Sequence, residues 1–187
     1  MKKVAIFASG SGSNAENIVH YFEKKNLIEI PLILTNNPSA FVIERAKKLN
    51  IPCEVFAKTD LTESNKIVDL LKSLEVEWLV LAGFLLKIPQ NLIDAFDGHI
   101  VNIHPALLPK YGGKGMYGDK VHQAVVDAGE SESGITIHYV NEHYDEGTII
   151  SQVKCEVKSE DTANDVANKV HALEYEHFPK VLEQIFQ

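Results

Sequence analysis

Short apolar runs alternate with amphipathic stretches through the first two thirds of the chain. Continuous apolar runs of this length are typical of strands that are buried on both faces of a parallel sheet. The runs that predict such strands lie at residues 4–8, 30–34, 53–56, 78–82 and 99–103. The stretches between them predict helices at residues 14–25, 41–49, 63–74 and 90–96. This order predicts an α/β fold with a mostly parallel sheet that helices cover on both faces.

The pattern changes after residue 110. A glycine-dense loop at 111–118 leads into a predicted helix at 119–128. Two further strands, at 135–140 and 149–157, are joined by a polar link and are predicted to pair antiparallel. A long helix at 162–186 follows, with a bend expected near Pro179. The chain of 187 residues contains no internal repeat, linker or low-complexity tract, so a single domain is expected.

Composition narrows the classes of partner. The formal net charge of −8 disfavours nucleic acid or an anionic membrane. Arg45 is the only arginine, so an anion site must use backbone amides, hydroxyls and lysine. Cys53 and Cys155 are too far apart for a disulfide framework or a CxxC knuckle and suit a reducing compartment. The apolar run at 4–8 is too short for a signal peptide and no run is long enough to cross a membrane, so a cytoplasmic location is expected.

A serine-glycine turn at residues 9–14 (Ser-Gly-Ser-Gly-Ser-Asn) follows the first predicted strand. Ser13 and Glu16 have the spacing of a capping box, which predicts a helix that starts at Ser13 or Asn14. Free amides at a helix N-terminus favour an anion. The turn lacks the lysine of a Walker loop and the third glycine of a dinucleotide fingerprint, so a monophosphate fits better than a triphosphate or NAD. A turn that only joins a strand to a helix is the alternative.

The segment at the end of the strand at 99–103 holds the strongest candidates for chemistry. Asn102 and His104 are two residues apart, so they project from the same face of the strand. A carboxamide can hold a developing oxyanion, and an imidazole can handle a proton. The polar link at 142–147 is either a solvated surface turn or a segment from which Asp145 reaches into the cleft and orients a histidine. A metal site is not expected, because the chain has neither an HExxH motif nor paired cysteines.

The remaining histidines have simpler interpretations. His20, His171 and His177 fall in predicted helices and are expected at the surface or its boundary. His138 lies in a predicted strand, where it either lines the cleft or is buried with its polar atoms satisfied. The alternative for Asn102 and His104 themselves is that both only satisfy the backbone at the entry of a loop.

Taken together and in this order, these motifs resemble the folate-dependent phosphoribosylglycinamide formyltransferase family. The resemblance runs from Val4 to about Phe186 and is carried by the turn at 9–14, Leu-Ala-Gly-Phe at 81–84, Asn-Ile-His-Pro at 102–105, Leu-Leu-Pro-Lys-Tyr at 107–111 and the turn at Asp145. It implies an α/β, Rossmann-like three-layer formyltransferase fold whose mostly parallel seven-stranded sheet has an antiparallel C-terminal part. It further implies one domain over 1–187, with a nucleotide- and phosphate-binding half at 1–100 and a folate-binding and catalytic half at 101–187.

The resemblance also implies an activity. Members of this family are one-carbon transferases that move a formyl group from 10-formyltetrahydrofolate to the amine of 5'-phosphoribosylglycinamide (glycinamide ribonucleotide). The products are 5'-phosphoribosyl-N-formylglycinamide and tetrahydrofolate, in the de novo biosynthesis of purines (IMP). The expected partners are therefore these two small molecules, without a metal, nucleic acid or a membrane. A monomer or weak homodimer is expected.

By position, the resemblance assigns roles to individual residues. The implied catalytic residues are Asn102, His104 and Asp145, and the implied phosphate-binding residues are Gly12, Ser13 and Asn14. The glycinamide end is assigned to Glu174. The implied folate-binding residues are Lys58, Leu85, Leu86, Lys87, Ile88, Asn102, Val140 and Tyr144. A cis peptide bond is implied before Pro109.

The chain departs from the family pattern on the folate side. Leu86 stands where many members carry an arginine, and Lys87 is the nearest cation. A second folate-side arginine is absent, with Lys58 as the closest substitute. Lysine lacks the planar fork of arginine, so it stays open which lysine takes over and which folate tail is preferred. The loop at 112–118 is longer than in many members and fits either a lid or a mobile surface loop.

Two other functions remain as rivals. One is a different formyl-folate enzyme on this fold, either a formyltetrahydrofolate hydrolase or the catalytic domain of a methionyl-tRNA formyltransferase. These enzymes carry further domains for which 187 residues leave no room. The other is a non-catalytic nucleotide-binding module, which would use the first turn and leave Asn102, His104 and Asp145 without a role.

Overall fold

A seven-stranded sheet forms the centre of the protein, in the order β3-β2-β1-β4-β5-β6-β7. The computed structural model describes residues 1–187. Neighbours among the first five strands pair in parallel, whereas β6 and β7 are antiparallel to β5 and β6 respectively. The predicted mixed sheet is thereby confirmed. The strands are β1 (Lys2–Phe7), β2 (Ile28–Thr35), β3 (Cys53–Val55), β4 (Trp78–Leu81), β5 (Ile100–His104), β6 (Glu132–Tyr139) and β7 (Ile149–Glu156).

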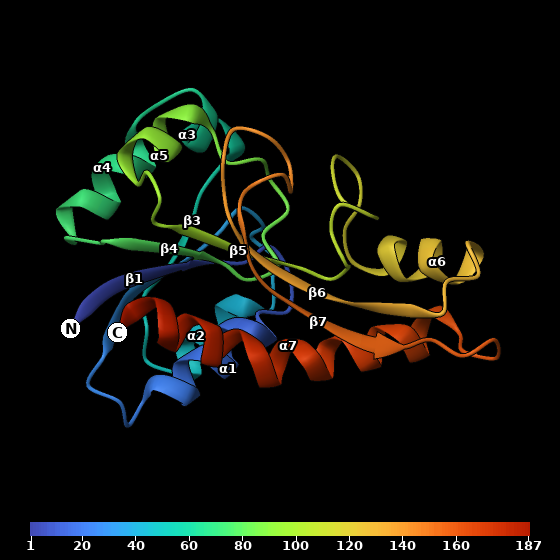
Figure 1. Ribbon diagram of the computed structural model, residues 1–187. Helices are drawn as coiled ribbons and strands as arrows, with labels where there is room; N and C mark the ends of the chain where they lie inside the picture. Colours follow the sequence, from blue (N-terminus) through green and yellow to red (C-terminus); the bar gives the residue numbers. More distant parts are fainter.

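Helices cover both faces of this sheet (Figure 1). One layer contains α1 (Ser13–Phe22), α2 (Val42–Lys48) and the long α7 (Ala163–Phe186). The opposite layer contains α3 (Lys58–Thr62), α4 (Lys66–Ser73) and α5 (Gln90–Ala95). Helix α6 (Asp119–Asp127) lies near the beginning of β6. None of these helices combines the length and the apolar character that crossing a membrane requires.

Strand β1 shows why the apolar runs are continuous. Val4 and Ile6 are fully buried in the apolar cluster under α1 and α7, whereas Ala5 and Phe7 are fully buried in a second cluster under α4 and α5. Because side chains alternate between the two faces, a strand with a helix layer on each side needs apolar residues at every position. The two clusters together make the three-layer core.

The helix boundaries correct several expectations. Helix α1 begins at Ser13 as predicted, but its capping box does not form, because the N-cap residue is Gly12 and no side chain caps the helix. Glu16 pairs with Arg45 of α2 instead. The predicted helix at 63–74 is the shorter α4, and α3 before it was not predicted. Helix α7 has its N-cap at Thr162 and continues through Pro179.

The sheet order reverses between β1 and β4, since β1 lies between β2 and β4. The loops that follow these two strands therefore diverge, and such a switch point is where open α/β sheets bind ligands. Ser9 ties the two loops together: its N–H donates to the carbonyl of Gly83 at 3.0 Å, and its hydroxyl oxygen accepts the N–H of Leu85 at 3.0 Å. The geometry of one loop thus depends on the other.

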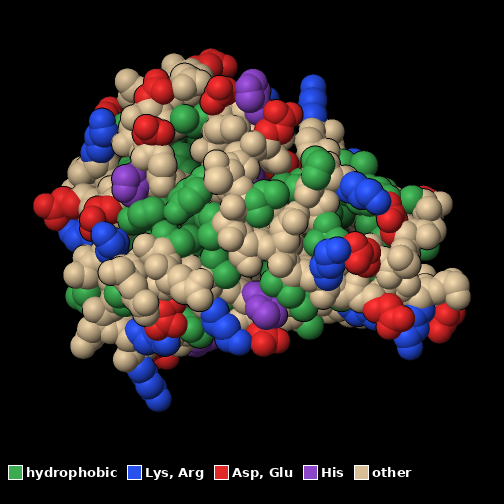
Figure 2. Space-filling model, viewed as in Figure 1, with side chains coloured by type: hydrophobic (Ala, Val, Ile, Leu, Met, Phe, Trp, Pro, Cys, Tyr) green, Lys and Arg blue, Asp and Glu red, His purple; other side chains and the backbone are tan.

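The two halves of the chain are packed into one body. Strands from residues 1–100 and from 101–187 share the single sheet, and the first helix lies beside the last (Figure 1). Lys25, after α1, forms an ion pair with Glu183 of α7 at 2.7 Å. On the face shown in Figure 2, acidic and basic side chains are interspersed around a band of hydrophobic side chains. The division of binding roles between the halves stays a prediction.

Candidate functional site

A cavity of about 820 Å³ opens at the carboxyl ends of the parallel strands. Its walls come from segments that are far apart in the sequence. These segments are residues 10–14 after β1, 82–85 after β4, 102–105 at the end of β5, 113–119 before and at the start of α6, His122 of α6, Tyr144 and Asp145 before β7, and His171 and Glu174 of α7. This cavity therefore lies at the sheet edge where the sequence places its candidate residues.

Asn102 and His104 both line this cavity from β5, as their alternation in the strand predicts. Pairing with β6 places His138 opposite Asn102 and Thr136 opposite His104. The Asn102 side-chain nitrogen lies 3.0 Å from Nε2 of His138. The antiparallel neighbour thus supplies a direct polar partner for the carboxamide.

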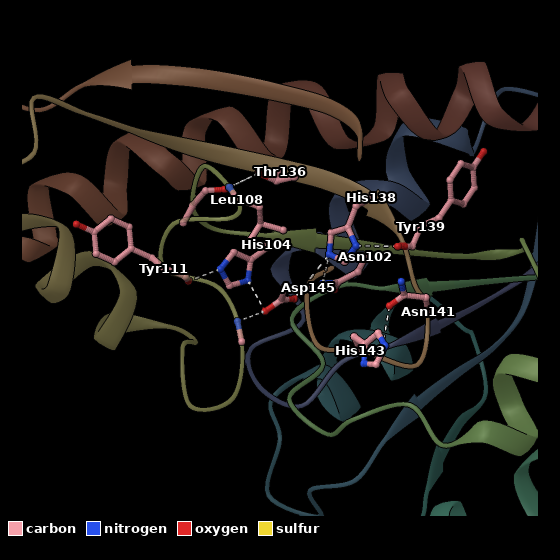
Figure 3. Close-up of polar contacts among 12 residues, drawn as sticks. Asn102, His104, Leu108, Tyr111, Thr136, His138, Tyr139, Asn141, His143 and Asp145 are labelled. Atoms are coloured by element: carbon pink, nitrogen blue, oxygen red, sulfur yellow. Dashed lines mark hydrogen bonds and ion pairs between the residues drawn. The ribbon is translucent and has the colours of Figure 1, made fainter. Parts of the chain in front are cut away.

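Asp145 lies between two histidines (Figure 3). Its Oδ2 atom is 3.6 Å from Nδ1 of His104, and its Oδ1 atom is 3.7 Å from Nε2 of His138. The N–H of Gly113 donates to Oδ2 at 2.9 Å, which anchors the carboxylate to the glycine-dense loop. The structure therefore brings together Asn102, His104 and Asp145, the three residues that the sequence singled out for chemistry.

The protonation of His104 follows from its surroundings. Burial lowers the pKa of His104, and the neighbouring charge of Asp145 opposes this shift without reversing it. Nε2 of His104 lies 2.7 Å from the carbonyl oxygen of Tyr111, and a carbonyl only accepts, so Nε2 carries the proton and Nδ1 faces Asp145. Burial raises the pKa of Asp145, but the contact with His138, the charge of His104 and the N–H of Gly113 together hold this pKa below its usual value. Burial thus favours the neutral form of His104, and its neighbours favour the charged form of Asp145.

The turn at residues 9–14 narrows the cavity on the opposite side. Gly12 has φ 72°, in the left-handed region that favours glycine, and a Cβ at this position would lie 2.8 Å from Cα of Val42. Ser13 and Asn14 form the first turn of α1, whose amides have no partner within the helix. These amides make the wall of the cavity suitable for an anion.

Glu174 connects the last helix to this turn. Its carboxylate is buried and receives the side-chain N–H of Asn14 at 2.9 Å and Nδ1 of His171 at 3.0 Å, both on Oε2. The hydrogen bond with Glu174 raises the pKa of His171. His171 was expected at the surface or its boundary, and its half-exposed side chain agrees with this, but its place in the wall of the cavity was not predicted. Its spacing of three residues from Glu174 in a helix was the signal that could have identified it.

The folate-side residues divide into two groups. Leu85, Asn102 and Tyr144 line the cavity, and Leu85 and Tyr144 are among the exposed large hydrophobic side chains. The other predicted contacts do not line it: Ile88 is buried in the core and Leu86 and Val140 pack against it, Lys58 begins α3, and the Lys87 ammonium group lies 5.8 Å from the centre of the Tyr144 ring. Contacts of this second group with a ligand stay predictions.

The loop at 112–118 forms the outer wall. Gly113 and Gly115 both have φ 90°. Lys114 is the only lysine or arginine among the residues that line the cavity. The peptide bond before Pro109 is cis, as the resemblance implies. No group of three His, Cys, Asp or Glu side chains is arranged to hold a metal ion.

Thr136 holds the strand exit that follows His104. Its hydroxyl donates to the carbonyl of Ala106 at 2.6 Å and accepts the N–H of Leu108 at 3.0 Å. Gln152 of β7 donates to the same hydroxyl and to the carbonyl of Leu108, both at 2.9 Å. The loop beside the cavity is thus hydrogen-bonded to both antiparallel strands.

Comparisons with known proteins agree with this geometry. Residues 2–182 match the family described as formyl transferase. The chain is 40% identical over 190 residues to the chloroplastic phosphoribosylglycinamide formyltransferase of Vigna unguiculata. This alignment covers 98% of the chain but only 61% of the Vigna protein. It is 40% identical over 192 residues to phosphoribosylglycinamide formyltransferase of Bacillus subtilis (strain 168), covering 99% of the chain and 95% of that protein.

The fold comparison gives the same family. The crystal structure of glycinamide ribonucleotide transformylase 1 from Geobacillus kaustophilus superposes with a TM-score of 0.91 at 35% identity, over 100% of both chains. The match to the family over nearly the whole chain and the close superposition on this crystal structure lead to the same family. The chain belongs to the formyl transferase family and, within it, to the phosphoribosylglycinamide formyltransferases.

Proposed function

We propose that this protein transfers a formyl group from 10-formyltetrahydrofolate to the amine of glycinamide ribonucleotide, in the de novo biosynthesis of purines. The observation that carries the proposal is the convergence of Asn102, His104 and Asp145 on the cavity that also reaches the turn at 9–14. One cavity thus offers an anion site and a group of polar side chains suited to acyl transfer. The products are the N-formylated ribonucleotide and tetrahydrofolate.

The ribonucleotide is held at its two ends. Its phosphate binds the first-turn amides at Gly12, Ser13 and Asn14, where the helix dipole favours negative charge. Its glycinamide portion lies toward Glu174, whose second carboxylate oxygen is left free by Asn14 and His171. The folate lies against the exposed faces of Leu85 and Tyr144. The ammonium group of Lys87 is close to the Tyr144 ring and can pair with the acidic tail of the folate.

The transfer step needs no covalent enzyme intermediate. The amine nitrogen attacks the formyl carbon, a C–N bond forms, and the carbonyl oxygen becomes a tetrahedral oxyanion. A side-chain N–H of Asn102 donates to this oxyanion. The bond to the folate N10 then breaks, and N10 leaves with a proton. One proton has moved from the amine to N10, so charge and atoms balance.

His104 carries that proton. Its lowered pKa favours the neutral ring, which accepts the proton of the attacking amine and passes it to N10, directly or through water. Asp145 is charged and lies beside Nδ1, so it stabilises the imidazolium during the step. The hydrogen bond from Nε2 to the carbonyl of Tyr111 fixes the ring meanwhile. The chemistry is therefore assigned to Nδ1.

The test uses a 10-formyl-folate analogue whose absorbance changes when the formyl group is lost. Loss of the formyl group only in the presence of glycinamide ribonucleotide, with a formylated ribonucleotide detected by mass spectrometry, supports the proposal. Equal loss without the ribonucleotide would instead indicate a hydrolase. No loss in either mixture, with the ribonucleotide still bound in a titration, would indicate a binding module. Sedimentation of the same sample would test the proposed monomer or weak homodimer.

A further inference from the structure

The orientation of the Asn102 carboxamide decides what it offers to a ligand. One end of the group donates through Nδ2 and the other only accepts through Oδ1, and the two ends have nearly the same shape. An oxyanion requires the donor end. Turning the group by half a rotation would replace attraction by repulsion, so a neighbouring residue must select the productive orientation.

His138 is the neighbour that makes this selection. Its Nδ1 atom lies 2.8 Å from the carbonyl oxygen of Tyr139, and because a carbonyl only accepts, Nδ1 must carry a proton. In the neutral ring, Nε2 is then an acceptor. The atom of Asn102 that lies 3.0 Å from Nε2 is Nδ2, which donates. The opposite orientation would press Oδ1 against the lone pair of Nε2.

Two polar groups approach Nε2 of His138, and the Asn102 carboxamide is the nearer of the two. The His138 side chain is only 2% exposed, so water does not replace the carboxamide. The nearest carboxylate oxygen, Oδ1 of Asp145, is 3.7 Å from Nε2, beyond the length of a hydrogen bond. Residues 102 and 138 are direct partners in the β5–β6 register, which holds the two side chains at this distance.

We propose that His138 is a positioning residue for formyl transfer, which acts by fixing the Asn102 carboxamide with Nδ2 as the donor end. The inference rests on the proposed function and adds a residue to it. One N–H of Nδ2 is given to His138, and the second N–H of the same atom remains for the oxyanion. The backbone carbonyl of Tyr139 is the origin of the selection, because it sets the tautomer of the ring.

Two substitutions of His138 separate positioning from simple packing. In His138→Gln the longer amide reaches the place of Nε2 and can accept from Asn102, whereas in His138→Asn the side chain ends near the place of Nδ1. We expect His138→Asn to lower kcat by about tenfold or somewhat more. This loss is smaller than the 10²–10³-fold loss of kcat expected when an oxyanion donor is removed altogether. The KM of the ribonucleotide should stay near wild type. His138→Gln should recover most of the kcat.

The decisive arm repeats His138→Asn in the Asn102→Ala background. A residue that acts only through Asn102 causes no further loss there, whereas an independent structural role lowers kcat by the same factor in both backgrounds. His20→Asn, at an exposed position on α1, is the matched control for the chemical change. The proposal would be overturned if His138→Asn lowered kcat by the same factor in both backgrounds. It would also be overturned if His138→Asn had a kcat no lower than that of His20→Asn.

A measurement independent of activity separates this proposal from the proposed function. The ¹⁵N chemical shifts of the His138 ring report which nitrogen is protonated, and we expect the proton on Nδ1. A proton on Nε2 alone would refute the selection of the carboxamide orientation. If the wild-type protein failed to transfer a formyl group, the function would be wrong, and the ring shifts would still decide whether His138 orients Asn102.

Discussion

Replacing Gly12 with alanine tests the serine-glycine turn most directly. Its φ of 72° lies where an L residue costs about 1–2 kcal/mol. The new Cβ would also lie 2.5 Å from Cβ and 2.8 Å from Cα of Val42, and the second of these atoms belongs to the backbone. Overpacking of this kind costs about 1–3 kcal/mol. Together the two effects predict a loss of roughly 2–5 kcal/mol, which lowers the melting temperature by roughly 4–20 °C in a chain of this size.

The same substitution should weaken binding of the ribonucleotide. The N–H of Val42 donates to the carbonyl of Gly10 at 3.1 Å, so a displacement at Val42 is passed along the whole turn. We expect the KM of glycinamide ribonucleotide to rise more than the KM of the formyl-folate, measured in the same absorbance assay. In the proposed binding mode these amides bind the phosphate of the ribonucleotide and do not touch the formyl-folate.

Gly98 provides a matched control for this prediction. It also has a positive φ, of 69°, but a Cβ there meets nothing within 4 Å. Gly98→Ala should therefore show only the backbone strain of about 1–2 kcal/mol, with both KM values unchanged. If Gly12→Ala matched Gly98→Ala in melting temperature and in KM, the argument for the turn would fail.

Four further predictions concern the cavity and the loop beside it. We expect Asn102→Ala and His104→Ala each to lower kcat by about 10²–10³ in a folded protein, and wild-type turnover would remove that side chain from the chemistry. Asp145→Asn deletes the charge that raises the pKa of His104, so that pKa falls further and the acid limb of the pH–rate profile should move to lower pH; an unmoved limb contradicts this role. Because folding lowers the pKa of both groups, the contribution of His104 to stability is lost as the pH falls below about 6.5, and that of Asp145 as it falls below about 3.9. Melting curves from about pH 7 to about pH 3 will check both losses. Thr136→Val leaves the N–H of Leu108 without its acceptor, at a cost of about 1–3 kcal/mol, and calorimetry that finds no loss would contradict the proposed bracing of the loop.

The strands of the parallel part were predictable because burial on both faces leaves a continuous apolar run. The predictions of helix boundaries were wrong where local patterns were too short or where distant residues decide the local structure. The capping box of Ser13 and Glu16 does not form, since Arg45, 29 residues away, pairs with Glu16 and also donates from Nε to the carbonyl of Ser11 at 2.8 Å. Helix α3 has five residues, too few for an apolar period to be visible.

The candidate site was predictable to the extent that it is local. Alternation along one strand was enough to place Asn102 and His104 on a common face. The partnership of Asn102 with His138 depends on the register between β5 and β6, and β6 begins at Glu132, three residues before the predicted strand. The sequence therefore allowed two interpretations of His138 and could not choose between them. The polar link has no periodicity, so the sequence left Asp145 either in a surface turn or in the cleft, and the resemblance to the family favoured the cleft.

The hydrogen bond between Asn14 and Glu174 spans 160 positions of the chain. During synthesis the serine-glycine turn leaves the ribosome early, but the carboxylate that completes its pocket arrives only with the last helix. In the proposed binding mode, a nascent chain therefore cannot gain full stability from the ribonucleotide until α7 has docked against α1. Binding of the substrate would then protect the finished fold against unfolding without assisting the earlier steps of folding.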